Sequence, residues 1–402
     1  MKEEMPHYPD SHHASAAKLL PEYPCLRGQQ RFSVCVIGAG YTGISAALHL
    51  SQMGHSVALV ESERVGWGAS GRNGGQLGYG MSDLLPDLIQ KCGEENARKF
   101  WDISVESVNL FHELSNNYNI DSDFKSGNMA CATSARDYDS LRSHADIVDG
   151  YGQQIYQQLD RPATLDMSGS PSYHGAILSR HAGHINPLKY ALGLAGAADS
   201  AGVSIFENST VTSIDMSQPV TVNTTNGSVI ADYAVLACNG HIGKLNTSLA
   251  ARILPIDNYQ AATEVLDGDV IDTLIKGGTC IWDTSKSVHY FRLTPDNRLV
   301  MGCGIGIPDH PPRNLERECR KHIAMVYPQL KGVKLDYIWG GTLGGTRNHL
   351  PDMGRLAPNV LYSQGYTGHG VGMAPLAGKY IARAIDGESR EFELLSQVTH
   401  KK

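Results

Sequence analysis

SVCVIGAGYTG, residues 33–43, joins a short apolar run to a glycine-rich turn. The turn has the pattern G-x-G-x-x-G at Gly38, Gly40 and Gly43, and residues 41–53 continue with the apolar spacing of a helix. A strand, such a turn and a helix, in this order, form the setting in which the motif binds a dinucleotide. We expect Gly38 to permit the tight turn, Gly40 to let the backbone approach a pyrophosphate, and Gly43 to let helix and strand pack closely.

A second apolar run, residues 57–60, ends at Glu61, which lies 23 residues after Gly38. An acid about 20 residues beyond the motif accepts a hydrogen bond from the adenosine ribose. The three elements predict a βαβ unit whose helix N-terminus offers N–H groups and partial positive charge to phosphates. Arg64 could bind a 2′-phosphate, in which case the cofactor would be NADP. Alternatively, Arg64 is an ordinary surface arginine.

The loop that follows favours a flavin over a nicotinamide. Residues 64–76, RVGWGASGRNGGQ, contain five glycines directly after the ribose-binding acid. A nicotinamide domain normally continues into another helix and strand. Here small residues and hydroxyl or amide donors continue past the phosphates, as a larger cofactor requires, so we expect FAD.

Composition excludes several other classes of protein. The chain has 402 residues, of which 41% are hydrophobic and 19% charged, a balance typical of a globular protein with two or three folded units. Its net charge of −7 gives no broad attraction for nucleic acid or anionic lipid. The eight cysteines form no C-x-x-C pair and no closely spaced set with histidine, so we expect no metal site, reduced thiols and a cytoplasmic location.

The N-terminus and the longest apolar stretch carry no membrane signal. Residues 1–30 contain Lys, Glu, His and several prolines without the continuous apolar core of a signal peptide, and we expect a loose arm. Residues 33–50 are interrupted by three glycines and His49, which indicates a strand and a helix and no transmembrane segment.

Further pattern changes predict the remaining elements. From residue 203 short alternating runs appear, and Asn226-Gly227 is a tight hairpin signal. The last unit, residues 360–384, repeats the strand, glycine loop and helix of the first, so we expect the two ends of the chain to meet in one domain. We also expect helices at 96–118, 188–201 and 316–327 and strands at 203–206, 211–214, 220–224, 233–237, 259–266, 289–293 and 299–302.

The glycine-rich loop also carries a family likeness. GASGRNGGQ, residues 68–76, resembles the FAD-dependent glycine oxidase, sarcosine oxidase and D-amino-acid oxidase family, and most of all its gamma-glutamylputrescine oxidoreductase and pipecolate oxidase branch. Four more runs resemble that branch in the same order: GHINPL at 183–188, YFRLTPDNRL at 290–299, YPQLKGV at 327–333 and QGYTGHGV at 364–371. The resemblance therefore extends over most of the chain.

We therefore expect an α/β fold with two parts and an N-terminal arm, residues 1–30. A discontinuous, Rossmann-like FAD-binding domain would comprise residues 31–95, 175–250 and 335–402. A substrate domain with a mixed or antiparallel sheet would comprise residues 96–174 and 251–334.

The resemblance implies where FAD binds. Ser70 and residues 73–76 would lie along the pyrophosphate, the ribityl chain and the ring edge, and Val211 would meet adenine through its backbone. Residues 368–372 would place a helix N-terminus beside the pyrimidine end of the flavin, where it stabilises negative charge. His369 there would add positive charge or serve as a structural histidine. The full set of expected FAD-binding residues is Gly38, Gly40, Tyr41, Thr42, Gly43, Glu61, Ser62, Gly68, Ser70, Arg72, Asn73, Gly74, Gly75, Gln76, Val211, Gly240, Gly368, His369, Gly370, Val371 and Gly372.

The implied reaction is oxidation of the C–N bond of a small amine or amino acid to an imine, by hydride transfer to flavin N5. It requires a neutral amine, which an apolar pocket favours. O2 or another acceptor would reoxidise the flavin, and because no cysteine lies near the flavin-ring loops we expect non-covalent FAD. An NAD(P)-dependent dehydrogenase and a non-catalytic, flavin-binding electron-transfer subunit remain the alternatives.

Candidate substrate-site residues come from the later strands. Tyr290 and Arg292 share a strand face by alternation, and with Tyr259 and His369 they are our expected catalytic residues. His289, Trp339 and Arg347 are further candidates for shaping the pocket.

Two features depart from the amine-oxidising branch. An acid commonly precedes its Tyr-Tyr/Phe-Arg-Leu run, whereas this chain has His289, so we expect a cationic substrate tail to lose a partner there. The sequence also ends soon after residues 392–395, where relatives typically continue into a basic and aromatic tail, and we expect that tail's role in covering the site to be absent.

Overall fold

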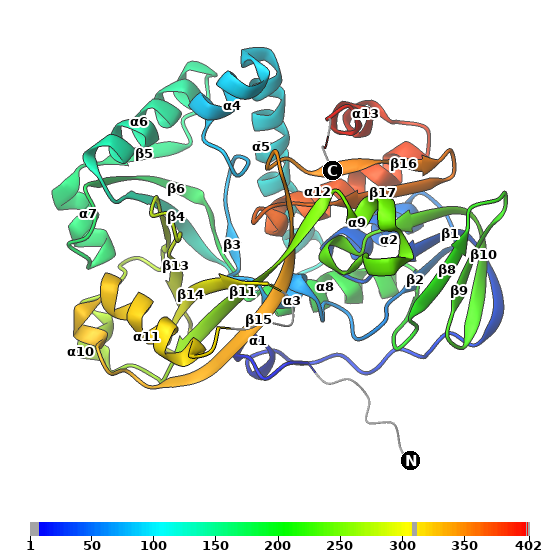
Figure 1. Ribbon diagram of the computed structural model, residues 1–402, viewed down its shortest axis with the longest axis horizontal. Coiled ribbons are helices and arrows are strands. Elements are labelled where there is room, and N and C mark those ends of the chain that lie inside the picture. The colour runs from blue at the N-terminus through cyan, green and yellow to red at the C-terminus, as the bar shows by residue number, and fades with distance from the viewer. Residues whose placement is uncertain (1–7, 308–311, 399, 401–402) are drawn as a thin grey trace.

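The computed structural model describes residues 8–307, 312–398 and 400. Within these residues the strands form an eight-stranded and a nine-stranded sheet, which occupy the two halves of the molecule in Figure 1. Helices cover both, so the predicted α/β fold with a mixed second sheet is confirmed.

The eight-stranded sheet has a parallel core in the order β17-β10-β1-β2-β7. Residues 34–37 and 57–60 are buried because helices pack over the sheet, as continuous apolar runs in parallel sheets predict. β17 pairs with β10 and β10 with β1, so the two ends of the chain do meet in one sheet. The strands are β1 (Gly28–Ile37), β2 (Val57–Val60), β7 (Ser204–Phe206), β8 (Val211–Asp215), β9 (Val220–Thr224), β10 (Gly227–Leu236), β16 (Asp352–Ala357) and β17 (Val360–Gln364).

Three long helices pack beside this sheet: α2 (Tyr41–Gln52), α8 (Pro187–Ser200) and α12 (Gly370–Ile385). Gly43 on α2 lies so close to the first turn that a Cβ there would collide with the carbonyl oxygen of Gly38. The predicted role of Gly43 in close helix packing is therefore confirmed. Shorter elements in this half are α9 (Thr247–Ala250), α13 (Arg390–Ser396), η1 (Asn239–His241) and η2 (Gly243–Leu245).

The nine-stranded sheet is mixed, because β12 runs parallel to β4 while its other paired strands are antiparallel. Its strands are β3 (Gln76–Leu77), β4 (Lys125–Ala132), β5 (Tyr156–Leu159), β6 (Gly175–His184), β11 (Ile253–Thr263), β12 (Cys280–Asp283), β13 (Tyr290–Leu293), β14 (Leu299–Gly306) and β15 (Leu335–Thr346). The helices around it are α4 (Leu85–Cys92), α5 (Glu94–Asn117), α6 (Ala135–Gly150), α7 (Arg161–Ser168), α10 (Gly268–Ile271), α11 (Leu315–Val326) and η3 (Pro328–Leu330).

Three strands lie in a different sheet from the one that their predicted domain implies, among them β3, which falls within residues 31–95 but pairs with β6. Residues 175–184 and 335–346 were expected with the FAD-binding domain, but β6 pairs with β4 and β15 pairs with β11. The physical reason is that an apolar run shows that a strand is buried without showing which strand it pairs with. The long strands β11 and β15 cross the middle of the molecule between the two halves in Figure 1.

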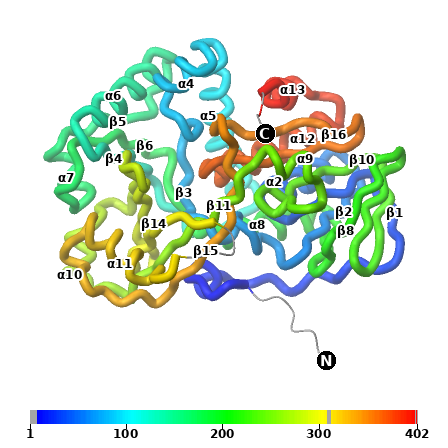
Figure 2. Tube along the Cα trace, viewed as in Figure 1, coloured from blue at the N-terminus to red at the C-terminus, as the bar shows by residue number. Residues whose placement is uncertain are grey.

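The expectation of a loose N-terminal arm is wrong for the N-terminal segment, residues 8–27. His12 and His13, in the short helix α1 (His12–Ser15), are 4% and 0% exposed, and Leu26 is fully buried. In Figure 2 the blue segment runs along the lower edge of the molecule to the place where the halves meet. Residues 1–7 of the expected arm lie outside the described residues. A segment rich in His and Pro is not expected to form a long helix or strand. Such a segment can still pack closely against the rest of the protein.

Candidate active site

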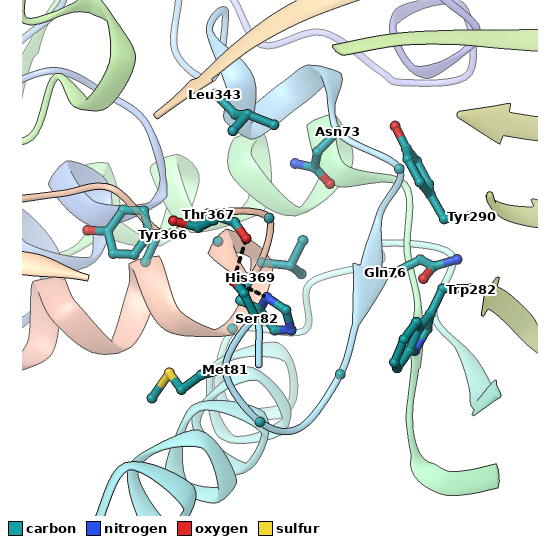
Figure 3. A pocket seen from close by; sticks show the side chains of 18 of the residues that line it. Asn73, Gln76, Met81, Ser82, Trp282, Tyr290, Leu343, Tyr366, Thr367 and His369 are labelled. Atoms are coloured by element: carbon teal, nitrogen blue, oxygen red, sulfur yellow. Dashed lines mark hydrogen bonds between the residues drawn. The ribbon is translucent and has the colours of Figure 1, made fainter. Parts of the chain in front are cut away.

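A cavity of about 510 Å³ lies where the two sheets meet. In Figure 3, Tyr290, Gln76 and Trp282 stand on one side of it, and Tyr366, Thr367 and His369 on the other. The predicted FAD-binding residues that line it are Gly40, Tyr41, Thr42, Ser70, Arg72, Asn73, Gly74, Gln76, Gly368, His369, Gly370, Val371 and Gly372. Those outside the lining are Gly38, Gly43, Glu61, Ser62, Gly68, Gly75, Val211 and Gly240.

The first glycine turn opens α2 toward the cavity. Gly38 has φ +101°, and a Cβ there would stand 2.8 Å from the carbonyl oxygen of Ala237, so its role in the tight turn is confirmed. Gly40 is the N-cap residue and offers no side-chain cap. The Ser70 hydroxyl accepts from the backbone N–H of Tyr41 at 3.0 Å, in the first turn of the helix. The helix N-terminus is therefore suited to an anion.

Glu61 is fixed beside this turn. Its carboxylate accepts from the backbone N–H of Ala39 at 2.7 Å, from that of Glu63 at 3.0 Å and from the Ser62 hydroxyl at 3.0 Å. Burial nevertheless raises the pKa of Glu61 above its ordinary value. The acid is thus held at the end of β2 next to the glycine turn, the position that a ribose-binding acid requires.

Arg64 is neither a free phosphate ligand nor a surface residue. Its side chain is 7% exposed, and Nε donates to Glu207 at 2.8 Å while Nη1 donates to Glu22 at 3.2 Å. Nη2 donates to the carbonyl of Leu20 at 3.1 Å. Both sequence interpretations of Arg64 were wrong, because its guanidinium ties the N-terminal segment to the buried acid that follows β7.

The glycine loop, residues 68–76, is held through its backbone. The Arg72 carbonyl accepts from Gln260 Nε2 at 2.6 Å and from the indole N–H of Trp339 at 3.0 Å. The Gly74 carbonyl accepts from Arg292 Nε at 2.9 Å. Within the loop is the short helix α3 (Ala69–Arg72). Side chains of the nine-stranded sheet thus fix the part of the loop that borders the cavity.

Asn73 stiffens the same loop from within. Its Oδ1 accepts from the Gly75 N–H at 2.8 Å, and its Nδ2 donates to the carbonyls of Ala69 and Ser70 at 3.0 Å each. An aspartate would accept the first bond but could not donate the other two. The asparagine therefore closes the turn from α3 into β3.

Tyr290 and Arg292 share one face of β13, as predicted, and both contact Gly74. A Cβ on Gly74 would stand 2.7 Å from the Tyr290 ring, and the Tyr290 hydroxyl donates to Asn258. Arg292 is 3% exposed, and burial lowers its pKa to about 10, so it stays charged at neutral pH. Tyr290 lines the cavity, whereas Arg292 lies behind the loop that it supports.

The other substrate-site candidates lie outside the lining. Tyr259 packs against Gly340, and Arg347 is exposed. His289 points to the opposite face of β13 from Tyr290, where its Nδ1 bonds Asp283 at 2.8 Å. The expected loss of a substrate partner at His289 is therefore wrong, because strand alternation turns this position away from the cavity.

His369 caps α12 at the cavity wall. Its Nδ1 lies 3.4 Å from the Ser82 hydroxyl, and burial lowers the pKa of its imidazole. The ring is therefore neutral at neutral pH, and the positive charge that we considered there is wrong. The positive end of α12 remains, because the side chain of its N-cap residue, His369, makes no cap hydrogen bond to the helix.

Sequence reasoning missed an aromatic wall formed by Tyr79, His144, Tyr156 and Trp282, all of which line the cavity. His144 Nδ1 accepts from the Leu85 N–H at 3.1 Å, and burial lowers its pKa to about 4. The four residues come from a loop, α6, β5 and β12, so no spacing along the chain could have grouped them. Asp83 also lines the cavity and pairs with Lys91 at 2.7 Å.

Comparison with known proteins identifies the family. A family model described as FAD dependent oxidoreductase matches residues 33–384. The chain belongs to this family. The gamma-glutamylputrescine oxidoreductase of Escherichia coli strain K12 is 35% identical over 397 residues, covering 98% of this chain and 93% of that relative. A glycine oxidase of Bacillus licheniformis is 25% identical over 368 residues, covering 89% and 94%.

The fold is also similar to that of a solved glycine oxidase. The crystal structure of glycine oxidase from Geobacillus kaustophilus superimposes with a TM-score of 0.77 at 22% identity, covering 92% of this chain and 100% of that one. The family assignment confirms the predicted FAD and oxidoreductase activity and removes the NAD(P)-dependent and non-catalytic alternatives.

The residues around the cavity fit FAD. Two helices, α2 and α12, begin at its wall, and their N-cap residues, Gly40 and His369, make no side-chain cap hydrogen bond. Among the described residues, Arg72 Nη2 and Gln260 Oε1 are buried without a hydrogen-bond partner, and both residues line the cavity. Such atoms require a partner, which the polar edge of a flavin can supply. No helix in the described part of the chain is long and apolar enough to span a membrane.

Proposed function

We propose that this protein oxidises the C–N bond of a small amine to an imine, and that the carbon it oxidises carries no carboxylate. Water then hydrolyses the imine to a carbonyl compound and ammonia or a smaller amine. FAD, bound in the cavity through the predicted residues, supplies the hydride acceptor. The E. coli relative's name supports a substrate resembling gamma-glutamylputrescine.

The charge of the cavity wall supports an amine over an α-amino acid. Across its described residues, the wall contributed by the nine-stranded sheet and α6 has no Lys, Arg, Asp or Glu, and His144 is neutral above about pH 4. A buried carboxylate without a cationic partner is strongly unfavourable. This uncharged wall is the observation on which the proposal depends.

The two arginines near the cavity are engaged elsewhere. Arg292 bonds the Gly74 carbonyl and does not line the cavity. Arg72 donates to the carbonyls of Trp67 at 2.6 Å and Gly340 at 3.3 Å and stacks over the Trp67 ring at 3.8 Å. It belongs to the glycine loop, so we assign its unpartnered Nη2 to the cofactor.

The aromatic wall suits an amine. Faces of Tyr and Trp rings attract a cationic ammonium group, and transfer into the cavity lowers the pKa of the amine by desolvation. The ring faces of Tyr79, Tyr156 and Trp282 therefore favour entry of the ammonium form, and the burial that these side chains provide favours its neutral form once inside. A neutral amine has the lone pair that drives hydride loss. Tyr290, fixed by Asn258 and by contact with Gly74, would orient the substrate against the glycine loop.

An anaerobic bleaching screen tests the proposal. Compounds that differ only by a carboxylate on the reacting carbon, such as methylamine and glycine, are mixed with oxidised holoenzyme beside gamma-glutamylputrescine, putrescine, sarcosine and pipecolate. Amines without that carboxylate should bleach the flavin. If glycine bleaches the flavin as fast as the amines do, the uncharged-wall argument is contradicted. If dithionite bleaches the flavin and no amine does, catalysis is contradicted.

The same preparation determines how FAD is held and reoxidised. Among the described lining residues there is no cysteine, so acid precipitation should release all the flavin into the supernatant. Flavin that stays with the pellet would contradict non-covalent binding. Admitting air to the bleached enzyme separates O2 from another acceptor, because only a reaction with O2 restores the colour rapidly.

A further inference from the structure

The N-terminal segment reaches the glycine loop through one buried side chain. His13 is fully buried, and its Nε2 lies 2.9 Å from the carbonyl oxygen of Asn73. The carbonyl of His13 itself accepts from Asn186 Nδ2 at 3.3 Å, and its ring packs edge-on against Trp339 with 4.9 Å between centroids. The backbone of His13 is thus held by Asn186 and its ring by Trp339, so the bond to the loop has a fixed direction.

This bond completes a continuous row. Three successive carbonyls of the loop each accept a hydrogen bond from a buried side chain. Residue 72 accepts from Trp339, residue 73 from His13 and residue 74 from Arg292. The loop residues line the cavity, whereas none of these three donors does. The loop is therefore held between the cavity and a layer of buried donors, and the middle donor comes from a part of the chain some sixty residues away.

We propose that the N-terminal segment is part of the cofactor site, with His13 as the positioning residue that holds the middle of the glycine loop against FAD. This rests on the assignment of the cavity to FAD and does not depend on the substrate. Without the His13 donor, the Asn73 carbonyl would be buried unpaired or the loop would turn to find another partner, and either outcome weakens FAD binding.

The environment keeps His13 a neutral donor. Burial, and after it the nearby Arg292 charge, hold the pKa of His13 well below its ordinary value. In the neutral ring the proton belongs on Nε2, because that atom faces a carbonyl oxygen and Nδ1 has no partner among the described residues. His12, its neighbour, instead bonds Asp296 at 3.0 Å and anchors the segment to the turn after β13.

The test compares two side chains of similar size. His13→Met fills the space without a donor, and His13→Gln places an amide N–H near the position of Nε2. His112→Ala is the control, because His112 also bonds a backbone carbonyl, that of His181 at 2.9 Å, away from the cavity. For each holoenzyme we would measure the FAD dissociation constant, the visible circular dichroism of the bound flavin and the thermal unfolding of the FAD-free protein.

We expect His13→Met to weaken FAD binding about ten-fold, the effect of losing one hydrogen bond to a buried group, and to alter the flavin dichroism. His13→Gln should restore both, and His112→Ala should change neither. The proposal is overturned if His13→Met leaves FAD binding and dichroism unchanged. It is also overturned if His13→Gln or His112→Ala changes them as much as His13→Met does.

Gly40→Leu separates this inference from the site assignment. A leucine at the start of α2 would obstruct the cavity, so it should abolish FAD uptake. If Gly40→Leu binds FAD normally, the cavity is not the FAD site and the proposed function loses its basis. If Gly40→Leu fails while His13→Met binds normally, only the role of His13 is refuted.

Discussion

Gly74 should be the most sensitive small residue of the cavity. An alanine Cβ there would stand 2.7 and 2.9 Å from two carbons of the Tyr290 ring. These separations fall short of the ~3.5 Å contact between carbon atoms by roughly 0.6–0.8 Å. The ring cannot retreat, because it packs so tightly on Gly302 that a Cβ there would collide with it, and its hydroxyl is bonded to Asn258.

The strain must therefore fall on the glycine loop and its row of donors. Overpacking of this kind destabilises a protein by about 1–3 kcal/mol, and a displacement of ~1 Å in a positioning element can slow a reaction ~100-fold. We expect Gly74→Ala to slow flavin bleaching by an active amine ten- to a hundred-fold, roughly, and to weaken FAD binding.

Gly78→Ala is the matched control. Gly78 also lines the cavity and also lacks a positive φ, but its Cβ would make an ordinary contact, 3.6 Å from Asn128. Stopped-flow bleaching under anaerobic conditions, FAD titration and thermal unfolding are measured for both variants. If Gly74→Ala bleaches as fast as Gly78→Ala and the unchanged protein, the reasoning about the Gly74 and Tyr290 contact is refuted.

Two further perturbations concern stability. Glu207→Gln leaves Arg64 buried with a weakened partner, so we expect a loss of about 3–5 kcal/mol in unfolding free energy by urea titration. Glu95→Gln, which breaks the exposed pair with Lys99, should cost far less, and equal losses would contradict this. The folded pKa of His144, about 4, lies below its unfolded value near 6.5, so the unfolded chain binds more protons and stability should fall as pH drops from about 6.5 toward 4. His144→Gln should flatten that slope, and an unchanged slope would show that other groups cause it.

The sequence predicts most accurately what local chemistry determines. Backbone sterics predict the roles of Gly38 and Gly43, and strand alternation predicts that Tyr290 and Arg292 share a face. The structure confirms both predictions. The strand, glycine loop and helix at residues 360–384 likewise reproduce the first unit, because the same apolar periodicity produces both.

What the sequence could not show depends on distant partners. His13 looks like one of several histidines in a tail, and its role arises only through Asn73 and Trp339. The aromatic wall likewise assembles from four separate elements, and the membership of β6 and β15 in the second sheet depends on pairing. The charge state of His369 depends on burial, which a sequence motif does not specify.

The long-range contacts of the N-terminal segment also have a consequence for biosynthesis. Residues 8–27 are synthesised before Arg64, Glu207, Asp296 and Trp339, yet the segment needs all four for its complete set of partners. Its docking is therefore a late event of translation, and a nascent chain that stops short of β15 would present the segment to chaperones and proteases instead.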